Sequence, residues 1–324
     1  MIEYVFSVED LARLRFAISP SWELVTSLRA LREPSRAAVH LEWVRSARGS
    51  LEGLDLRAAL ALLVRRDYTP DFVTPPPESP LATIEDDLER IRATPAAQVR
   101  REVSVVAERS RAPELEAFLR HPRREARRLA DVLAEYWERA LAPRWPRVRA
   151  LLEADLGRRA RSLSETGAGA ALGDLHPGVR WAGDRLRVNV ALDRTCVLEG
   201  RGLQLVPSAF QWEGPVAVIG APWQPSVIYP ARGVALLWEA EPPLQDGVTK
   251  VLGRTRARVL AAVAAPTTTT QLAQRLDISA AGASQHLTAL AAAGLVSGSR
   301  EGREVLYLRS DLGDALMAGR TIQR

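Results

Sequence analysis

Residues 279–296 have the sequence SAAGASQHLTALAAAGLV, which predicts a helix with a defined start and end. Ser279 is a typical N-cap residue, because its hydroxyl can accept a hydrogen bond from a free backbone N–H of the first turn. Gly294 suits the C-terminal cap, where the backbone often turns left-handed. We therefore expect a helix over residues 280–293.

This predicted helix has one apolar face and one small, polar face. At about 100° per residue, Ala283, Leu287 and Leu290 fall together and form the side expected to be buried. The residues on the opposite side are Ala281, Ser284, Gln285, Thr288 and Ala292. His286 lies at the flank of the apolar face, where packing or a backbone hydrogen bond is expected rather than a DNA contact or a metal ligand.

The flanking sequence predicts a complete small domain. Apolar residues between Val248 and Val263 recur with helical spacing and stop before Pro266, and Thr269 or Thr270 can cap a short second helix. Asp277 and Ile278 then form the turn before the third helix. Residues 295–300 and 304–309 have strand-like patterns, joined by a tight turn over residues 301–303. Helix, helix, turn, helix and hairpin together predict a winged helix-turn-helix.

Such a domain binds DNA for geometric reasons, since a helix fits the major groove and the hairpin can reach the backbone. Gln285 can make a bidentate contact to adenine, while Ser284 and Thr288 suit bases or phosphates. Arg300 and Arg303 can neutralise phosphate at the hairpin. The predicted DNA-binding residues are Ser279, Ala281, Ser284, Gln285, Thr288, Arg300 and Arg303. The alternative is a merely solvated helix face.

Residues 279–296, the preceding Leu272–Ala273 helix and the wing residues 300–303 resemble ArsR-type winged-helix regulators over about 75 residues. The resemblance implies a homodimer on an inverted-repeat operator of double-stranded DNA, under control of an effector. Three N-terminal stretches (residues 10–20, 200–208 and 229–233) resemble actinobacterial ArsR-like regulators with a long N-terminal domain.

The chain departs from the metal-sensing members of that family. Those members hold metal through a Cys-x-Cys pair or through His and Asp at the dimer interface, whereas this chain has one cysteine, Cys196, and one histidine after residue 247. We therefore expect no metal site and no cofactor. A single cysteine also excludes an intramolecular disulfide framework.

Charge and aromatic residues divide the 324-residue chain at the same place. Residues 248–324 hold ten Lys and Arg against five Asp and Glu, and residues 1–247 hold 34 of each, so the net charge of +5 belongs to the last 77 residues. Seventeen of the 18 aromatic residues lie before residue 248, and only Tyr307 lies after it. The two parts therefore need different kinds of core.

The first 246 residues predict a helical region followed by a sheet. Residues 1–170 begin with a strand at 2–6, with Ser7 and Asp10 as cap residues, and continue as helices interrupted by a proline-rich loop at 69–77. Arginine runs at 120–128 and 144–161 are solvated helix faces or a second DNA contact. Residues 171–246 contain short apolar runs at 186–190, 203–207, 216–219 and 234–238, which predict a small antiparallel sheet packed on the helices.

The sheet region is rich in aromatic side chains. They are Trp181, Phe210, Trp212, Trp223, Tyr229 and Trp238. Core packing explains such a group, and an aromatic-lined pocket for a small effector is the alternative.

No pattern predicts an enzyme. The chain has neither a Gly-x-Gly-x-x-Gly after a strand nor a phosphate-binding loop with lysine, and its four histidines are far apart. Gly200–Gly202 is expected to be a turn rather than a phosphate cradle. Cys196 is expected to be buried and inert, with a redox role as the alternative.

The prediction is an α+β, mainly α protein with three regions: 1–170 helical and regulatory, 171–246 sheet, 247–324 winged helix-turn-helix. Without a long apolar segment or an N-terminal signal pattern, we expect no membrane contact and a cytoplasmic location. The predicted function is a dimeric, sequence-specific transcriptional regulator, a repressor, whose N-terminal region senses a small non-metal effector. The alternative is an N-terminal protein-interaction or dimerisation module without a small ligand.

Overall fold

The computed structural model describes residues 1–324 except 65–67, 80–81, 239–245, 265–266, 277, 302–303 and 318–324. The chain forms two compact units, Met1–Trp238 and Glu239–Arg324, called here the N-terminal and C-terminal units. Both combine helices with small sheets, and helices dominate, so the predicted α+β, mainly α class is confirmed. Pro266, Asp277 and Arg303 of the sequence predictions lie outside the described residues.

The helices of the N-terminal unit come mostly before its strands. The α-helices are α1 (Val8–Ala12), α2 (Pro20–Arg32), α3 (Leu41–Ser50), α4 (Arg57–Leu62), α5 (Ile84–Ala93), α6 (Ala96–Ala107), α7 (Pro113–Arg120), α8 (Pro122–Tyr136) and α9 (Trp145–Gly173). Short turns are η1 (Ala38–His40), η2 (Asp71–Val73), η3 (Trp137–Leu141, a π-helix) and η4 (Val234–Leu237). The expected cap of the first helix is present, since Ser7 and Asp10 form a reciprocal capping box.

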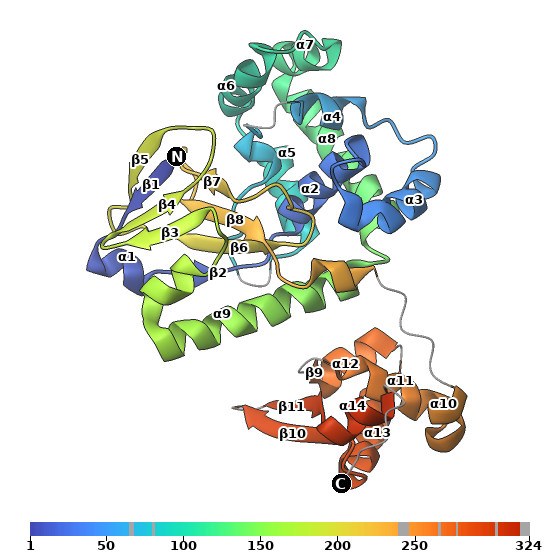
Figure 1. The fold of residues 1–324 in the computed structure, drawn as a ribbon. Coiled ribbons are helices and arrows are strands. Elements are labelled where there is room, and N and C mark those ends of the chain that lie inside the picture. Colours follow the sequence, from blue (N-terminus) through green and yellow to red (C-terminus); the bar gives the residue numbers. More distant parts are fainter. Residues whose placement is uncertain are drawn as a thin grey trace. The chain divides into compact units, whose positions relative to one another are not determined.

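Eight strands of this unit form two four-stranded sheets. The strands are β1 (Ile2–Val5), β2 (Arg15–Phe16), β3 (Val179–Ala182), β4 (Arg185–Val188), β5 (Arg194–Val197), β6 (Gln204–Ser208), β7 (Val216–Val218) and β8 (Ser226–Pro230). Their orders are β3-β4-β1-β5 and β2-β6-β8-β7. In Figure 1 the sheets lie on one side of the unit and helices α3, α4, α6 and α7 on the other.

The prediction of one small antiparallel sheet is wrong. Strands β1 and β2, from the first 16 residues, enter the two sheets and pair in parallel with β5 and β6, and β6 is also parallel to β8. Parallel neighbours need a long crossover, and here almost the whole helical region supplies it. The predicted helical and sheet regions are therefore one compact unit rather than two successive ones.

Residues 234–238 were expected to form a strand and instead form η4, a 3-10 turn, after Gly233. Gly233 has a φ of 87°, which breaks an extended path. The apolar run is buried through Leu237 and Trp238, and its hydrophobicity reflects burial rather than sheet pairing.

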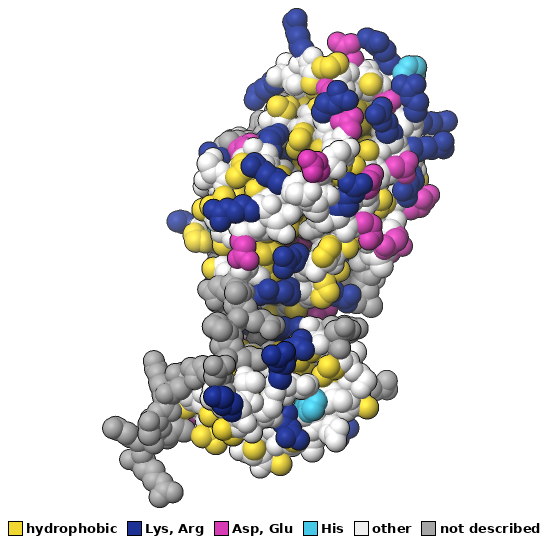
Figure 2. Space-filling view, turned by 90° about the vertical axis from the view of Figure 1, so that its right-hand side faces the viewer, with side chains coloured by type: hydrophobic (Ala, Val, Ile, Leu, Met, Phe, Trp, Pro, Cys, Tyr) yellow, Lys and Arg dark blue, Asp and Glu magenta, His cyan; other side chains and the backbone are white. Residues whose placement is uncertain are grey.

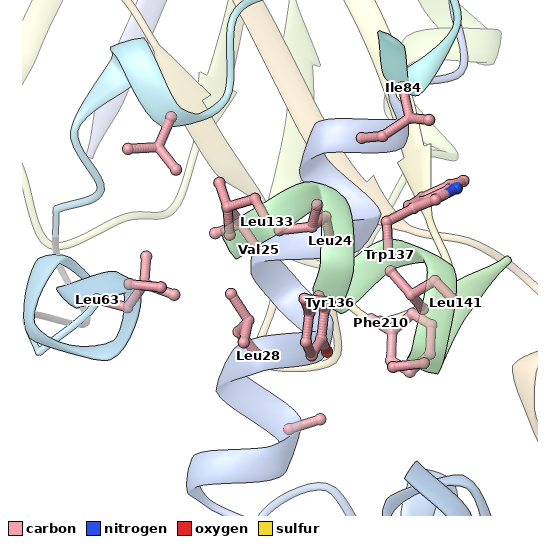
Figure 3. Packing of buried hydrophobic residues seen from close by; sticks show 14 of the residues in the cluster. Leu24, Val25, Leu28, Leu63, Ile84, Leu133, Tyr136, Trp137, Leu141 and Phe210 are labelled. Carbon is pink, nitrogen blue, oxygen red and sulfur yellow. The ribbon is translucent and has the colours of Figure 1, made fainter. Parts of the chain in front are cut away.

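Helix α2 is the centre of the larger core. All of its residues from Pro20 to Leu28 are buried, including polar Ser21, Glu23 and Thr26. In Figure 3, Val25 and Leu28 of α2 lie beside Leu133 and Tyr136 of α8. The Tyr136 hydroxyl also bonds the Ser27 hydroxyl at 2.7 Å, so this apolar contact includes a satisfied polar pair.

The C-terminal unit has five helices and three strands in its described residues. They are α10 (Asp246–Leu252), α11 (Arg254–Ala262), β9 (Thr267–Thr268), α12 (Thr269–Leu276), α13 (Ala280–Ala292), β10 (Val296–Glu301), β11 (Glu304–Arg309) and α14 (Asp311–Met317). The three strands form one sheet in the order β10-β11-β9.

The upstream helix predicted from Val248 to Val263 is two helices. Gly253 separates α10 from α11 with a φ of 79°, a left-handed value that favours glycine. Val251 was expected in the apolar stripe but is 79% exposed. The break at Gly253 gives α10 and α11 different axes, so the stripe does not continue along one face.

Candidate nucleic-acid interface

Helix α13 is anchored by the face that the sequence predicts. Ala283, Leu287 and Leu290 are buried in the core of the C-terminal unit, together with residues of α11 and α12. Helix α13 starts where Ser279 caps it, because the Ser279 Oγ accepts a hydrogen bond from the Gly282 N–H at 3.0 Å. Gly294 follows the helix with a φ of 71°.

The opposite face of α13 is open to solvent. Every side chain predicted to contact DNA on this helix (Ala281, Ser284, Gln285 and Thr288) is exposed, as is the cap residue Ser279. Thr288 donates its hydroxyl hydrogen to the Ser284 carbonyl at 2.9 Å, so its methyl group and the two acceptor lone pairs of its Oγ1 stay available. Gln285 makes no such bond and offers a free amide, which suits bidentate recognition of a base edge.

Small side chains give this face its shape. Ala280, Ala281 and Gly282 form the first turn, which contains no acidic residue. The free N–H groups and positive dipole at a helix N-terminus attract phosphate, and small side chains let the backbone approach it closely.

The wing is a regular antiparallel hairpin. Strands β10 and β11 pair in antiparallel register from Val296 with Arg309 to Glu301 with Glu304. Arg300 is exposed and lies opposite Val305 in this register, and Arg303 lies outside the described residues. A basic side chain at a hairpin tip can contact the phosphate backbone.

The third strand of the wing sheet and the cap of α12 were not predicted. Thr268, rather than Thr269 or Thr270, caps α12: its Oγ1 accepts from the Gln271 N–H at 3.2 Å, and its own N–H donates to the Gln271 Oε1 at 3.0 Å. The sequence does contain this capping box as Thr-x-x-Gln at 268–271. No sequence pattern predicts strand β9, because the strand is only two residues long.

The basic residues of this unit fall into two groups. Arg258 and Arg275 donate to backbone carbonyls at Leu276 and Ala262, and Arg309 pairs with Asp314 at 2.6 Å, so these three hold the fold. The exposed basic residues outside these three contacts are Lys250, Arg254, Arg256 and Arg300, and Arg275 is itself exposed. Some basic residues of this unit therefore make contacts within the fold, and others present their positive charge to solvent.

We expect Ser279→Ala to destabilise the C-terminal unit by about 1 kcal/mol, because the N–H of Gly282 loses its partner. Amide hydrogen exchange over residues 280–292 measures the effect as faster opening of the first turn. Ser284→Ala is the matched control, since its hydroxyl caps nothing and alanine favours helices. Equal exchange in both variants would refute the capping role.

The six aromatic residues of the sheet region, for which a pocket was the alternative interpretation, are divided between separate hydrophobic clusters. Trp181 and Tyr229 belong to a cluster formed by residues of both sheets, where Trp181 packs edge-on against Phe6 at 5.1 Å. Phe210, Trp212 and Trp238 gather instead around buried His40, and Trp223 packs at the edges of two clusters. Core packing, the first of the two interpretations, fits this distribution.

Buried His40 was not singled out by the sequence. Its Nδ1 accepts a hydrogen bond from the Trp238 Nε1 at 2.8 Å, and its ring stacks on Phe210 at 4.6 Å. Burial lowers the pKa of His40 to about 4, so the ring is neutral at pH 7. His40 thereby fixes Trp238, the last residue of the N-terminal unit, to its core.

The segment Gly200–Gly202 and the side chain of Cys196 are engaged in the fold. Gly200–Gly202 forms a turn in which the Gly202 N–H donates to Asp10 Oδ1 at 3.0 Å. This backbone N–H is therefore already bonded to a carboxylate of the chain. Cys196 is buried, and burial raises the pKa of its thiol, which disfavours the reactive thiolate.

The comparisons with known proteins agree with this geometry. Residues 252–298, which run from the end of α10 into β10, match the model of a helix-turn-helix domain. The C-terminal unit contains a DNA-binding helix-turn-helix. Residues 92–235 match a family of unknown function (DUF5937), which covers most of the N-terminal unit after α5. No curated protein and no solved structure matches the chain.

The described residues contain no candidate metal site and no membrane-spanning helix. No group of three or more His, Cys, Asp or Glu side chains in this part of the chain could hold a metal ion, and the lack of a metal site stays a prediction. No helix in the described ranges has the length and apolar character needed to cross a bilayer.

Proposed function

We propose that the protein is a cytoplasmic, sequence-specific transcriptional repressor of the ArsR type, which binds an inverted-repeat operator as a homodimer. The exposed face of α13, with Gln285 on a helix anchored by Leu287 and Leu290, carries this proposal. A solvent-exposed glutamine on a helix fixed between a turn and a wing is the arrangement that reads a base edge in the major groove. The domain match, whose range includes this helix, supports DNA binding.

The N-terminal unit is proposed to regulate this binding in response to a small, non-metal effector, without catalysis. A ligand that prefers one arrangement of the two DNA-binding units of a dimer would change their fit to half-sites one helical turn apart. The distribution of the six aromatic residues between clusters favours the second candidate, in which the N-terminal unit acts through protein contacts. Quenching of tryptophan fluorescence by a metabolite extract would support the effector, and co-purification of a protein partner would support the alternative.

We expect Gln285→Ala to lower the preference for the operator over random DNA by about 10–100-fold, because one bidentate base contact is worth about 1–3 kcal/mol. Genomic fragments retained by the purified protein give the operator, and competition binding at fixed salt gives the preference. The variant should lose its preference for the wild-type base at one A·T pair of the operator.

Arg300→Gln is the matched comparison, since a phosphate contact carries no base information. This variant should bind operator and random DNA more weakly by the same factor and reduce the salt dependence by about one counterion. A wild-type protein that binds its selected fragments no better than random DNA would contradict the proposed function.

A further inference from the structure

The solvent face of α8 carries four arginines within its first two turns. Arg123, Arg124, Arg127 and Arg128 are all exposed, and we call them the α8 arginine face. The residues buried on the other side of the helix are Pro122, Glu125, Ala126, Leu129, Ala130, Leu133 and Tyr136. Packing of the N-terminal unit therefore does not require the four arginines.

The order of charges along α8 lowers the stability of the helix. Arg123 with Arg127, and Arg124 with Arg128, are like charges four residues apart, which repel each other. Cations are also disfavoured near a helix N-terminus, whereas the exposed acidic residues Asp131 and Glu135 lie in the second half, where anions are disfavoured. Helix stability thus gives no reason for this arrangement.

Neighbouring acidic residues neutralise only part of the face. Arg124 pairs with Glu125 at 2.8 Å, and Arg128 approaches Asp55 at 3.8 Å. In the described ranges, Arg123 and Arg127 have no ion pair or side-chain hydrogen bond. Asp131, one turn after Arg127, is paired with Arg92 at 3.0 Å instead.

The positive surface extends beyond α8. Arg100 of α6 donates its Nε to the Leu119 carbonyl at 3.1 Å, which places it beside the end of α7. Arg120 is there too, 72% exposed, in a solvated pair with Glu116. Figure 2 shows basic and acidic side chains interspersed over much of one face of the molecule, with neighbouring Lys and Arg side chains at its upper right edge.

We propose that the α8 arginine face binds the phosphate backbone of DNA, as a second contact of the chain beside the C-terminal unit. The inference rests on the proposed function, since it takes DNA as the partner. Guanidinium groups match phosphate bidentately, and each neutralised phosphate releases counterions. Such a contact adds affinity without sequence preference.

The composition of the face favours nucleic acid over an acidic protein. Protein interfaces centre on buried apolar or aromatic residues with a polar rim. Among the described residues, no large exposed hydrophobic side chain lies on α8. A surface of arginines that has no apolar centre suits a partner that binds through its charge, such as the phosphate backbone.

The double variant Arg123→Gln, Arg127→Gln tests the proposal in the full chain. Glutamine keeps helix propensity and removes one repulsive pair, so the unfolding midpoint should not fall. Binding to operator and to random DNA should weaken equally, by about tenfold at physiological salt, and the slope of log K against log salt should fall by about two.

The control is Arg45→Gln, Arg194→Gln, which removes two exposed arginines from α3 and β5. It should leave the slope unchanged. If the α8 variant keeps the wild-type slope, or loses no more than the control, the inference is overturned. Loss of binding to poly-glutamate with DNA binding intact would also overturn it and point to an acidic protein.

Failure of this inference can be told apart from failure of the proposed function. If the wild type prefers its operator and Gln285→Ala removes that preference, while the α8 variant behaves as wild type, only the α8 contact is refuted. If the wild type shows no salt-sensitive binding to DNA, the proposed function fails first.

Discussion

Replacing Arg159 with leucine is expected to lower the free energy of unfolding of the N-terminal unit by about 3–5 kcal/mol. The Arg159 side chain is 5% exposed, and its Nε pairs with Asp155, itself fully buried, at 3.2 Å. Removing Arg159 takes away the buried cation of this pair and leaves the buried Asp155 charge only the half-exposed Arg158, which costs far more than the loss of a surface pair.

The guanidinium of Arg159 has further partners that leucine cannot replace. Its Nη1 and Nη2 donate to the carbonyls of Asp174 and Leu175, just after α9, at 2.9 and 3.2 Å. It also stacks over the Tyr229 ring at 4.8 Å, while the Tyr229 hydroxyl donates to Asp155 at 3.0 Å. Arg159 therefore ties α9 to β8 and to the turn that precedes β3.

Arg158 provides the matched control. It contacts the same carboxylate, at 2.6 Å, but its side chain is 44% exposed. Arg158→Leu should cost less than about 1 kcal/mol, since water screens the pair. Urea unfolding followed by tryptophan fluorescence measures both variants in the N-terminal unit, because all eight tryptophans lie within Met1–Trp238. Equal losses in the two variants would contradict the role of burial.

The second large effect concerns pH. Glu23 is completely buried on α2 and accepts hydrogen bonds from the N–H groups of Ala209 and Phe210 at 2.9 and 3.2 Å. No basic side chain compensates its charge in the described structure, and burial raises the pKa of its carboxyl to about 7 from an ordinary value of 4.5.

The sign of the effect follows from the proton count. Between pH 4.5 and 7 the unfolded chain releases the Glu23 proton and the folded chain keeps it, so the stability from Glu23 is complete below pH 4.5 and is lost as pH rises through about 7. Glutamine keeps an acceptor oxygen and has no charge to bury. Relative to wild type, Glu23→Gln should therefore gain roughly 2–3 kcal/mol between pH 4.5 and 7.5.

The measurement is the difference in unfolding free energy between variant and wild type at several pH values. The difference is needed because His40, whose pKa burial lowers to about 4, contributes an opposite slope below pH 6.5 in both proteins. Glu42→Gln, at an exposed position on α3, should give a flat difference. A flat difference for Glu23→Gln as well would show that the carboxyl is ionised at neutral pH in the folded chain.

Most of the proposed interface could be predicted from the sequence because its determinants are local. The Ser279 cap, the apolar spacing of Ala283, Leu287 and Leu290, and the turn at Gly294 each act within a few residues. The hairpin after Gly294 follows from two adjacent strand patterns. Where local reasoning failed in this unit, a glycine at 253 broke a continuous apolar stripe.

The N-terminal unit was less predictable because its determinants are distant in the chain. The residues of β1 pair with β5 about 190 positions later, and nothing in a short window of sequence specifies such a partner. The same holds for Phe210 and Trp238, whose places beside His40 depend on the packing of three separate segments. An aromatic residue in sequence predicts burial, and only packing decides whether it lines a space or fills it.

The sequence by itself determined the fold class, the helix that we propose to face DNA and the residues on its exposed side, since helix periodicity and capping are short-range properties. The tertiary structure decided the mixed pairing of the two sheets, the burial of Glu23 and Asp155, and the packing of the six aromatic residues into separate clusters. These depend on contacts between distant segments, whose free energies come from burial and neighbouring charges that a linear pattern does not contain.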